Sequence, residues 1–297
     1  MQYAAIDIGT NAARLLIGEV TEIEGTSFVK KLSYTRIPLR LGESVFEDGI
    51  IPEKKQSEFR KSMQAFKLIS ELFDVKELRA CATSAMREAK NGLEVQKMLR
   101  EETGVDVEII AGSEEAKLIL STFFLMGVDK ATPFIVIDVG GGSTEVSVFE
   151  NGVRTASKSF KIGTIRLLKG KVSKDIWSQI NNWVAKHIDL ETVRQIYATG
   201  GNINKVHKLL GAGHMEPISF EKMNTLRNEL DELSMVQRMT KFQLRPDRAD
   251  VIVPALDIYL YIMKELVCDE IIVPKIGLSD GMIYSMHLKH SKRKQKS

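Results

Sequence analysis

The stretch "FIVIDVGGGSTEVSVFENG", residues 134–152, predicts an apolar strand, a glycine-rich turn and a second apolar strand. An earlier stretch, "AAIDIGTNAARLLIGEV" at residues 4–20, has the same features in the same order. With an offset of 131 residues, Asp7 aligns with Asp138. A strand–turn–strand unit that recurs in register predicts two similar domains, which we expect to face each other across a cleft.

The rest of the chain alternates between strand-like and helix-like runs, a pattern that favours the α/β fold class. After the first pair of strands we expect a third strand near residues 26–34, then a loop that contains Gly42 and Gly49. Residues 53–73 follow as an amphipathic helix, because their apolar side chains recur at helical spacing.

The domain boundaries follow from the point at which the pattern restarts, near residues 132–133. We predict a first domain over residues 1–125 and a second domain over residues 126–281. A last helix, over about residues 282–297, is expected to pack back on the first domain.

Composition places the chain among ordinary globular proteins. Its 297 residues are enough for two domains, and 43% of them are hydrophobic and 27% charged. Its apolar runs are shorter than the ~18 residues that a membrane-spanning helix needs. Residues 1–8 are too short and too acidic for a signal peptide, so we expect a cytoplasmic protein without a membrane partner.

The net charge of +3 comes from the end of the chain. Residues 287–297 contain five lysines and arginines and no acid, so the rest of the chain carries −2. A basic surface that binds nucleic acid is therefore not indicated, and any anion site must be local. A solvated chain end is the simpler interpretation of this tail, and an anion-binding arm is the alternative.

The second turn carries the groups that a phosphate site needs. Glycines have no Cβ, so an anion can approach their backbone N–H groups closely, and hydroxyl groups add donors. The candidate phosphate-binding residues here are Gly140, Gly141, Gly142, Ser143 and Thr144. Asp138 at the strand tip could hold a divalent cation, and Glu145 could contact that metal or position a water. A plain hairpin is the alternative, but the repeat in register favours phosphate binding.

The first turn is the weaker candidate, because phosphate binding and a plain hairpin explain it almost equally well when it is taken alone. Its Asp7 is a further candidate metal ligand. Its candidate substrate-binding residues are Gly9, Thr10, Asn11 and Arg14. Since only the second turn has three glycines and a following glutamate, we expect catalysis there and mainly substrate binding at the first turn.

Three further stretches carry candidate residues. In "ATSAMREAKN", residues 82–91, Arg87 follows a strand, where an arginine can bind phosphate with two hydrogen bonds. In "GSEEAKLI", residues 112–119, Glu115 stands in the first turn of a helix, where acids also complement the helix dipole. A third glycine turn, in "YATGGN", could contact a sugar, a base or further phosphates through Gly200, Gly201 and Asn202, or could simply cap a helix.

Together with "IDIGTNAARLLI", "VIDVGGGSTEV", "RPDRADVIVPAL" and "GLSDGMIY", these stretches resemble the exopolyphosphatase/guanosine pentaphosphate phosphohydrolase (Ppx/GppA) family. The resemblance covers nearly the whole chain. It implies two ribonuclease-H-like domains of the actin and Hsp70 superfold. It also implies a short form without the C-terminal HD-type domain of longer relatives. One departure is Ala12, which replaces a serine that is common in the family.

The resemblance also implies roles for the site residues. Glu115 matches the general base that activates water, Glu145 the acid that orients the water or metal, and Asp138 the metal-associated acid. Arg87 matches the arginine that contacts phosphate. The implied cofactor is Mg²⁺ or Mn²⁺.

The expected activity is release of terminal phosphate from inorganic polyphosphate, from pppGpp, or from both, by metal-assisted attack of water. These substrates are the expected partners, and a homodimer is left open. An ATPase or kinase of the same superfold is one alternative. A polyphosphate- or alarmone-binding regulator without turnover is the other.

Overall fold

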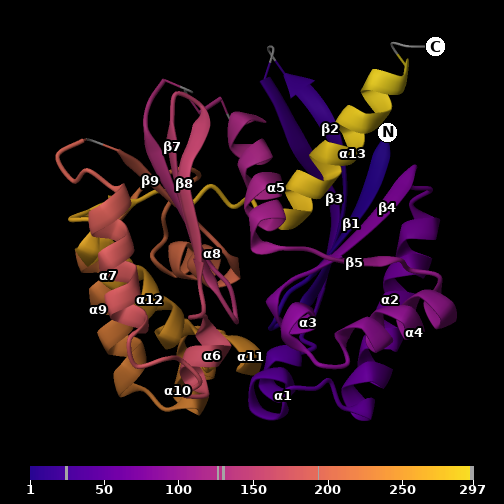
Figure 1. The fold of residues 1–297 in the computed structure, drawn as a ribbon, viewed down its shortest axis with the longest axis horizontal. Coiled ribbons are helices and arrows are strands. Elements are labelled where there is room, and N and C mark those ends of the chain that lie inside the picture. Colours follow the sequence, from indigo (N-terminus) through magenta and orange to yellow (C-terminus); the bar gives the residue numbers. More distant parts are fainter. Residues whose placement is uncertain (24–25, 126, 129–130, 193, 295–297) are drawn as a thin grey trace. The chain divides into compact units, whose positions relative to one another are not determined.

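The computed structural model describes residues 1–23, 26–125, 127–128, 131–192 and 194–294. The chain divides into two compact units, Met1–Val128 with Ile276–Ser297, and Asp129–Lys275. Each unit has its own mixed sheet with helices packed against it, which confirms the predicted α/β class (Figure 1).

The sheet of the first unit has the strand order β3-β2-β1-β4-β5. Its strands are β1 (Gln2–Ile8), β2 (Ala13–Ile23), β3 (Thr26–Ile37), β4 (Glu77–Ala82) and β5 (Val107–Ile109). Strands β1, β2 and β3 are antiparallel neighbours, whereas β1, β4 and β5 run parallel. The carboxyl ends of the three parallel strands therefore lie at one edge of the sheet.

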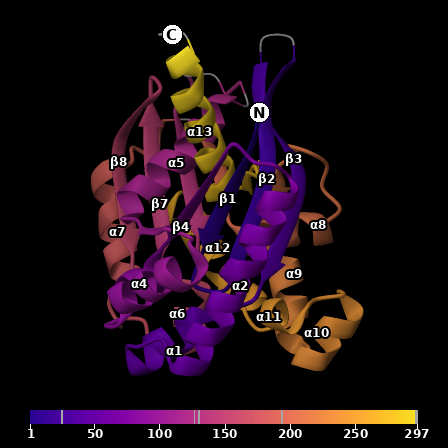
Figure 2. The ribbon, with the colours of Figure 1, turned by 90° about the vertical axis from the view of Figure 1, so that its right-hand side faces the viewer.

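Helices cover both faces of this sheet (Figures 1 and 2). The helices of the unit are α1 (Leu41–Asp48), α2 (Glu53–Leu72), α3 (Ser84–Glu88), α4 (Gly92–Thr103), α5 (Gly112–Leu125) and α13 (Leu278–Lys294). On one face, Phe59, Met63 and Phe66 of α2 are fully buried in a core shared with Leu99 of α4. On the other face α13 packs on α5, β1 and β2. A Cβ on Gly281 would lie 2.0 Å from the Leu118 carbonyl oxygen, so glycine permits this close packing of α13 on α5.

The prediction of a loop around Gly42 and Gly49 is wrong, because Leu41–Asp48 form helix α1. Gly42 lies inside the first turn of α1, where a Cβ would be 2.2 Å from Thr10 Cγ2. The lack of a side chain at Gly42 therefore allows close packing and does not indicate a turn. Gly49, at φ 78°, ends the helix and donates its N–H to the Val45 carbonyl over 3.0 Å.

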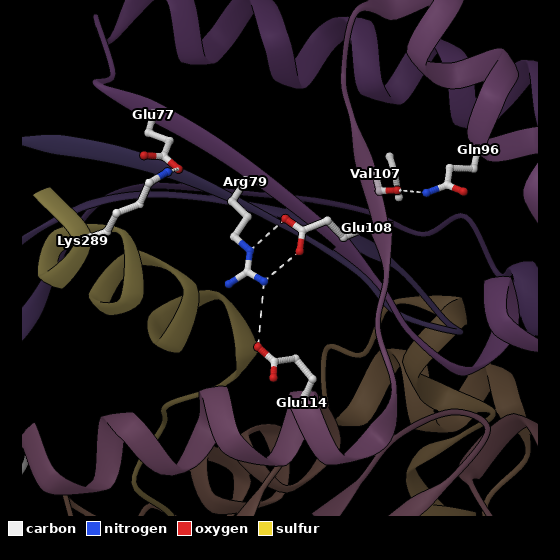
Figure 3. Close-up of polar contacts among 7 residues, drawn as sticks. All are labelled: Glu77, Arg79, Gln96, Val107, Glu108, Glu114 and Lys289. Atoms are coloured by element: carbon white, nitrogen blue, oxygen red, sulfur yellow. Dashed lines mark hydrogen bonds and ion pairs between the residues drawn. The ribbon is translucent and has the colours of Figure 1, made fainter.

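The basic tail is also more ordered than a solvated chain end, since α13 continues to Lys294. Lys289 Nζ and His290 Nε2 lie 2.7 and 2.6 Å from the two carboxylate oxygens of Glu77 on β4, and Figure 3 shows the Lys289 pair. Residues 295–297 lie outside the described part of the chain. These contacts anchor α13 on the sheet of the first unit.

The sheet of the second unit repeats the first four strand positions, with the order β8-β7-β6-β9. Its strands are β6 (Phe134–Val139), β7 (Thr144–Glu150), β8 (Val153–Phe160) and β9 (Gln195–Thr199). As in the first unit, the first three strands are antiparallel neighbours and the fourth runs parallel to the first. The duplication inferred from the two turns thus extends to the topology of the sheets.

The helices of the second unit are α6 (Thr164–Leu168), α7 (Ile176–His187), α8 (Gly201–Leu209), α9 (Phe220–Glu232), α10 (Met235–Lys241), α11 (Pro246–Ala249) and α12 (Ile252–Glu265). A short pair of strands, β10 (Ile218–Ser219) and β11 (Glu270–Ile271), accompanies them. Helix α12 is the most apolar of these, and it buries Ile252, Leu256, Tyr259 and Met263 in the core of the unit.

Candidate functional site

The turn between β6 and β7 is held from behind by the start of α6. The N–H of Gly140 closes the turn on the Ser143 carbonyl over 2.9 Å. The Gly140 carbonyl accepts from the N–H of Thr164 over 3.0 Å, and the Gly141 carbonyl accepts from Ile165 N–H over 2.8 Å. These bonds direct the carbonyls of the turn toward α6.

This arrangement orients the backbone N–H groups of the turn. In a planar trans peptide the N–H points opposite to the preceding carbonyl, so the N–H groups of Gly141 and Gly142 point away from α6. Among the described residues, the N–H groups of Gly141, Gly142 and Ser143 donate to no protein acceptor. Consecutive N–H groups of this kind form a concave donor site for an anion.

The turn between β1 and β2 is built in the same way. The N–H of Gly9 donates to the Ala12 carbonyl over 3.1 Å. The carbonyls of Thr10 and Asn11 accept from the N–H groups of Gly42 and Arg40, each over 3.0 Å, at the start of α1. Each turn therefore has a short helix behind it, and the loss of the hydroxyl at Ala12 leaves the backbone of the turn intact.

Two predicted side chains bond to the turns or their supports. Thr10 Oγ1 lies 2.7 Å from Ser84 Oγ at the start of α3, and both residues are buried. Thr144 Oγ1 donates to the Ile162 carbonyl over 2.7 Å, and Thr144 is fully buried. Both hydroxyls thus hold the turns in place.

The acidic residues at the two strand tips have cross-strand neighbours of opposite charge. Asp138 is paired with Glu145 in the β6–β7 ladder, so the two acidic residues are cross-strand neighbours on the same face at the end of the sheet. Asp7 is paired with Arg14 in the β1–β2 ladder, and Arg14 Nη1 donates to Asp7 Oδ2 over 2.6 Å. The aspartate of the first tip is therefore ion-paired with its cross-strand neighbour, whereas the aspartate of the second tip has a second acid at the equivalent position.

Glu145 is 6% exposed, and its Oε1 accepts a hydrogen bond from Ser159 Oγ on β8 over 2.6 Å. This bond restrains the carboxylate of Glu145, which lies on the same face of the sheet as Asp138. Two carboxylates supply the hard oxygen ligands that Mg²⁺ and Mn²⁺ prefer, and Mg²⁺ often binds one or two carboxylates together with water and substrate phosphates. The described residues contain no group of three or more acidic, histidine or cysteine side chains able to hold a metal, so a cation here would also need such outside ligands.

The two glutamates at the start of α5 have different surroundings. Arg79 on β4 donates to both carboxylate oxygens of Glu108 on β5, over 2.9 and 2.8 Å, and its Nη2 lies 4.0 Å from Glu114 Oε1 (Figure 3). Consecutive residues of a helix point about 100° apart. Glu114 therefore belongs to a surface ion-pair cluster, which leaves Glu115 as the better candidate for catalysis.

Arg87 on α3 lies at the junction that leads into α5. Its Nη1 donates to the Ile110 carbonyl over 2.6 Å, and the Ile110 N–H donates to the Ala82 carbonyl over 3.0 Å. Because β1, β4 and β5 are parallel, the structure brings the Gly9 turn, Arg87 and the start of α5 to the same edge of the first sheet.

The third glycine turn lies beside Asp138 in the second unit. Gly200 has φ 121°, and a Cβ on it would lie 2.8 Å from the Val139 carbonyl oxygen and 3.3 Å from Asp138 Oδ1. Only glycine fits this conformation and this approach. After Gly201, which begins α8, Asn202 Oδ1 accepts from Arg248 Nη1 over 2.5 Å.

Sequence reasoning missed several residues that support these turns. The Tyr259 hydroxyl of α12 donates to the Thr199 carbonyl and accepts from the Val139 N–H over 3.3 Å. Burial, and secondly the negative charge of Asp138, raise the pKa of Tyr259 well above its ordinary value, so the hydroxyl stays protonated. Arg248 had a signal, because it lies within "RPDRADVIVPAL", but an apolar helix gave no sign of the role of Tyr259.

Comparison with known proteins identifies the family and the fold of the chain. The sequence pattern of the Ppx/GppA phosphatase family matches residues 20–290. An exopolyphosphatase from Cytophaga hutchinsonii ATCC 33406 is 23% identical, with 96% of this chain and 97% of that chain covered and a TM-score of 0.81. A Ppx/GppA family member from Aquifex aeolicus is 24% identical, with 98% of each chain covered and a TM-score of 0.75.

At these identities the two structures establish the fold alone. The repeated strand order of the two sheets is that of the ribonuclease-H-like fold of the actin type. The chain belongs to the Ppx/GppA phosphatase family. None of the described helices combines the length and the apolar character needed to cross a membrane.

Proposed function

We propose that this protein hydrolyses phosphoanhydride bonds and releases the terminal phosphate of inorganic polyphosphate, of pppGpp, or of both. The observation that carries the proposal is the pairing of Asp138 with Glu145 beside a turn whose N–H groups point away from their support. Phosphoryl transfer depends mainly on positioning and on charge neutralisation, and this arrangement provides for both. A fold relative that carries the name exopolyphosphatase adds support for polyphosphate as substrate.

In this proposal the second turn binds the phosphoryl group that is released. The N–H groups of Gly141, Gly142 and Ser143 donate to its oxygens and stabilise the charge that develops on them. Asp138 and Glu145 hold Mg²⁺ or Mn²⁺, which when bound neutralises phosphate oxygens.

Glu115 accepts the proton of the attacking water, and Arg87 contacts a phosphate of the substrate. The first turn contributes backbone donors from Thr10 and Asn11, while Gly9 closes that turn through its bond to the Ala12 carbonyl. Arg14, already paired with Asp7, adds positive charge near that turn. Gly200, Gly201 and Asn202 contact parts of the substrate beyond the reacting phosphate.

Phosphate release should be measured from polyphosphates of defined length, from pppGpp and from ATP, each with and without Mg²⁺. We expect release from polyphosphate or pppGpp that depends on the metal. Release from ATP alone would favour the ATPase, and micromolar binding without release would favour a regulator; either result would contradict the proposal.

The matched pair Glu115→Gln and Glu114→Gln tests the base. We expect Glu115→Gln to bind substrate and to lose turnover, while Glu114→Gln, which changes a residue of the surface ion-pair cluster, keeps most of it. Full turnover in Glu115→Gln would exclude this residue as the base.

A further inference from the structure

One side chain supports the second turn in addition to the backbone of α6. Arg166, in the third position of α6, donates from Nε to the Gly142 carbonyl over 2.8 Å. Its backbone N–H donates to the Gly141 carbonyl over 3.1 Å. Arg166 is 8% exposed, and burial of a guanidinium is costly unless hydrogen bonds compensate it. A buried arginine on this carbonyl therefore requires an explanation.

The Gly142 carbonyl sets the direction of the next N–H group. The peptide between Gly142 and Ser143 is planar and trans, so a carbonyl held toward α6 places the Ser143 N–H on the opposite side. Glycine resists rotation of its peptides less than any other residue. Without a donor on this carbonyl, the peptide can turn over and present an oxygen where the anion needs an N–H.

The backbone donors of α6 do not meet this need. Thr164 and Ile165 hold the Gly140 and Gly141 carbonyls, which fixes the N–H groups of Gly141 and Gly142. The Arg166 side chain extends the same support by one residue, to the peptide whose N–H belongs to Ser143. The set of three parallel donors is complete only with this bond.

We propose that Arg166 is a positioning residue of the phosphate site, which acts through the Gly142 carbonyl to direct the Ser143 N–H toward a substrate oxygen. The inference rests on the proposed function, since that function makes the anion a phosphate. It differs from a purely electrostatic role, in which the positive charge alone would attract the substrate.

Binding of tripolyphosphate to the full chain, measured by calorimetry with Mg²⁺, tests the proposal without relying on turnover. The variants are Arg166→Met, which removes the donor and the charge, and Arg166→Lys, which keeps the charge but not the Nε donor. The control is Arg194→Met, because Arg194 is also largely buried in the second unit but pairs with Glu150 over 3.0 Å. We expect both Arg166 variants to bind about 10- to 100-fold more weakly, the effect of one lost hydrogen bond to a charged group, and the control to bind as wild type.

The second measurement is the amide NMR signal of Ser143 during titration with inorganic phosphate. It should shift in the wild type and not in Arg166→Lys, while the Gly141 signal shifts in both. Wild-type affinity in Arg166→Lys would overturn the proposal in favour of charge alone, and an equal loss in Arg194→Met would overturn it in favour of general destabilisation. A wild type that binds neither probe would remove the proposed function as well, whereas tight binding by wild type and both Arg166 variants would remove this inference alone.

Discussion

Replacement of Gly163 by alanine would test whether the segment before α6 determines the shape of the second turn. The backbone at Gly163 is extended, with φ −154° and ψ 170°, so alanine meets no backbone strain there. The added Cβ would nevertheless lie 2.5 Å from the carbonyl carbon of Gly141 and 2.5 Å from the nitrogen of Gly142. Non-bonded carbon atoms are normally about 3.5 Å apart or more.

Both of these neighbours are backbone atoms, so no side-chain rotation can relieve the contact. The turn and the segment behind it must separate by about 1 Å to restore normal van der Waals distances. Overpacking of this kind reduces the free energy of unfolding by about 1–3 kcal/mol. A displacement of about 1 Å at groups that position a reactant costs on the order of 100-fold in rate.

The assay is steady-state phosphate release, with urea unfolding as the measure of stability. We expect Gly163→Ala to lower kcat/KM by about 100-fold while the protein remains folded. Gly277→Ala is the control, because a Cβ on Gly277 would meet no atom within 4 Å. Wild-type kcat/KM in Gly163→Ala, or an equal loss in Gly277→Ala, would refute the close-packing argument.

Three other predictions concern Glu145, Arg14 and Cys81. Glu145→Gln removes one of two adjacent carboxylates, so the Mg²⁺ concentration for half-maximal phosphate release should rise about tenfold or more, and an unchanged requirement would contradict the metal site. Arg14→Met removes the ion-pair partner that lies 2.6 Å from the buried Asp7, which is 8% exposed. The free energy of unfolding, measured in urea, should fall by about 1–3 kcal/mol, and a second substitution, Asp7→Asn, should restore part of it. Additive losses in that double variant would argue against the ion pair. Burial raises the pKa of the Cys81 thiol from 9.0 to about 12, so the unfolded chain loses this proton first as the pH rises. Between pH 9.0 and about pH 12, the free energy of unfolding should fall by about 1.4 kcal/mol per pH unit more than it does in Cys81→Ala. Equal slopes in the two proteins would refute the raised pKa of Cys81.

The residues of the two turns could be predicted from sequence because their signals are local. An acid at the end of an apolar strand, followed by glycines, is a short pattern that recurs in both halves. The neighbours of those acids could also have been predicted: when the two strands of each hairpin are paired across the turn, Arg14 falls opposite Asp7, and Glu145 falls opposite Asp138. The ladder register contained this information, whereas the turn motif alone did not.

The supports of the turns could not be predicted in this way. Helices α1 and α6 are short, and Gly42 at the start of α1 is a residue that usually indicates a loop. These helices support the turns through hydrogen bonds, but in the sequence two strands separate each helix from the turn that it supports. The role of Arg166 likewise depends on the position of one carbonyl, which no periodicity or composition reveals.

Arg14 and Glu145 occupy equivalent positions of the repeat. This difference affects how the stability of each half depends on cations in solution. In the first half the countercharge of the strand-tip aspartate is part of the chain and is present at constant stoichiometry. If Asp138 and Glu145 of the second half hold the proposed metal, a cation that binds only the folded form adds RT ln(1 + [cation]/Kd) to the free energy of unfolding of residues 129–275. Under that proposal the free energy of unfolding of the second half would rise with the concentration of divalent metal, whereas the Asp7–Arg14 pair of the first half needs no metal.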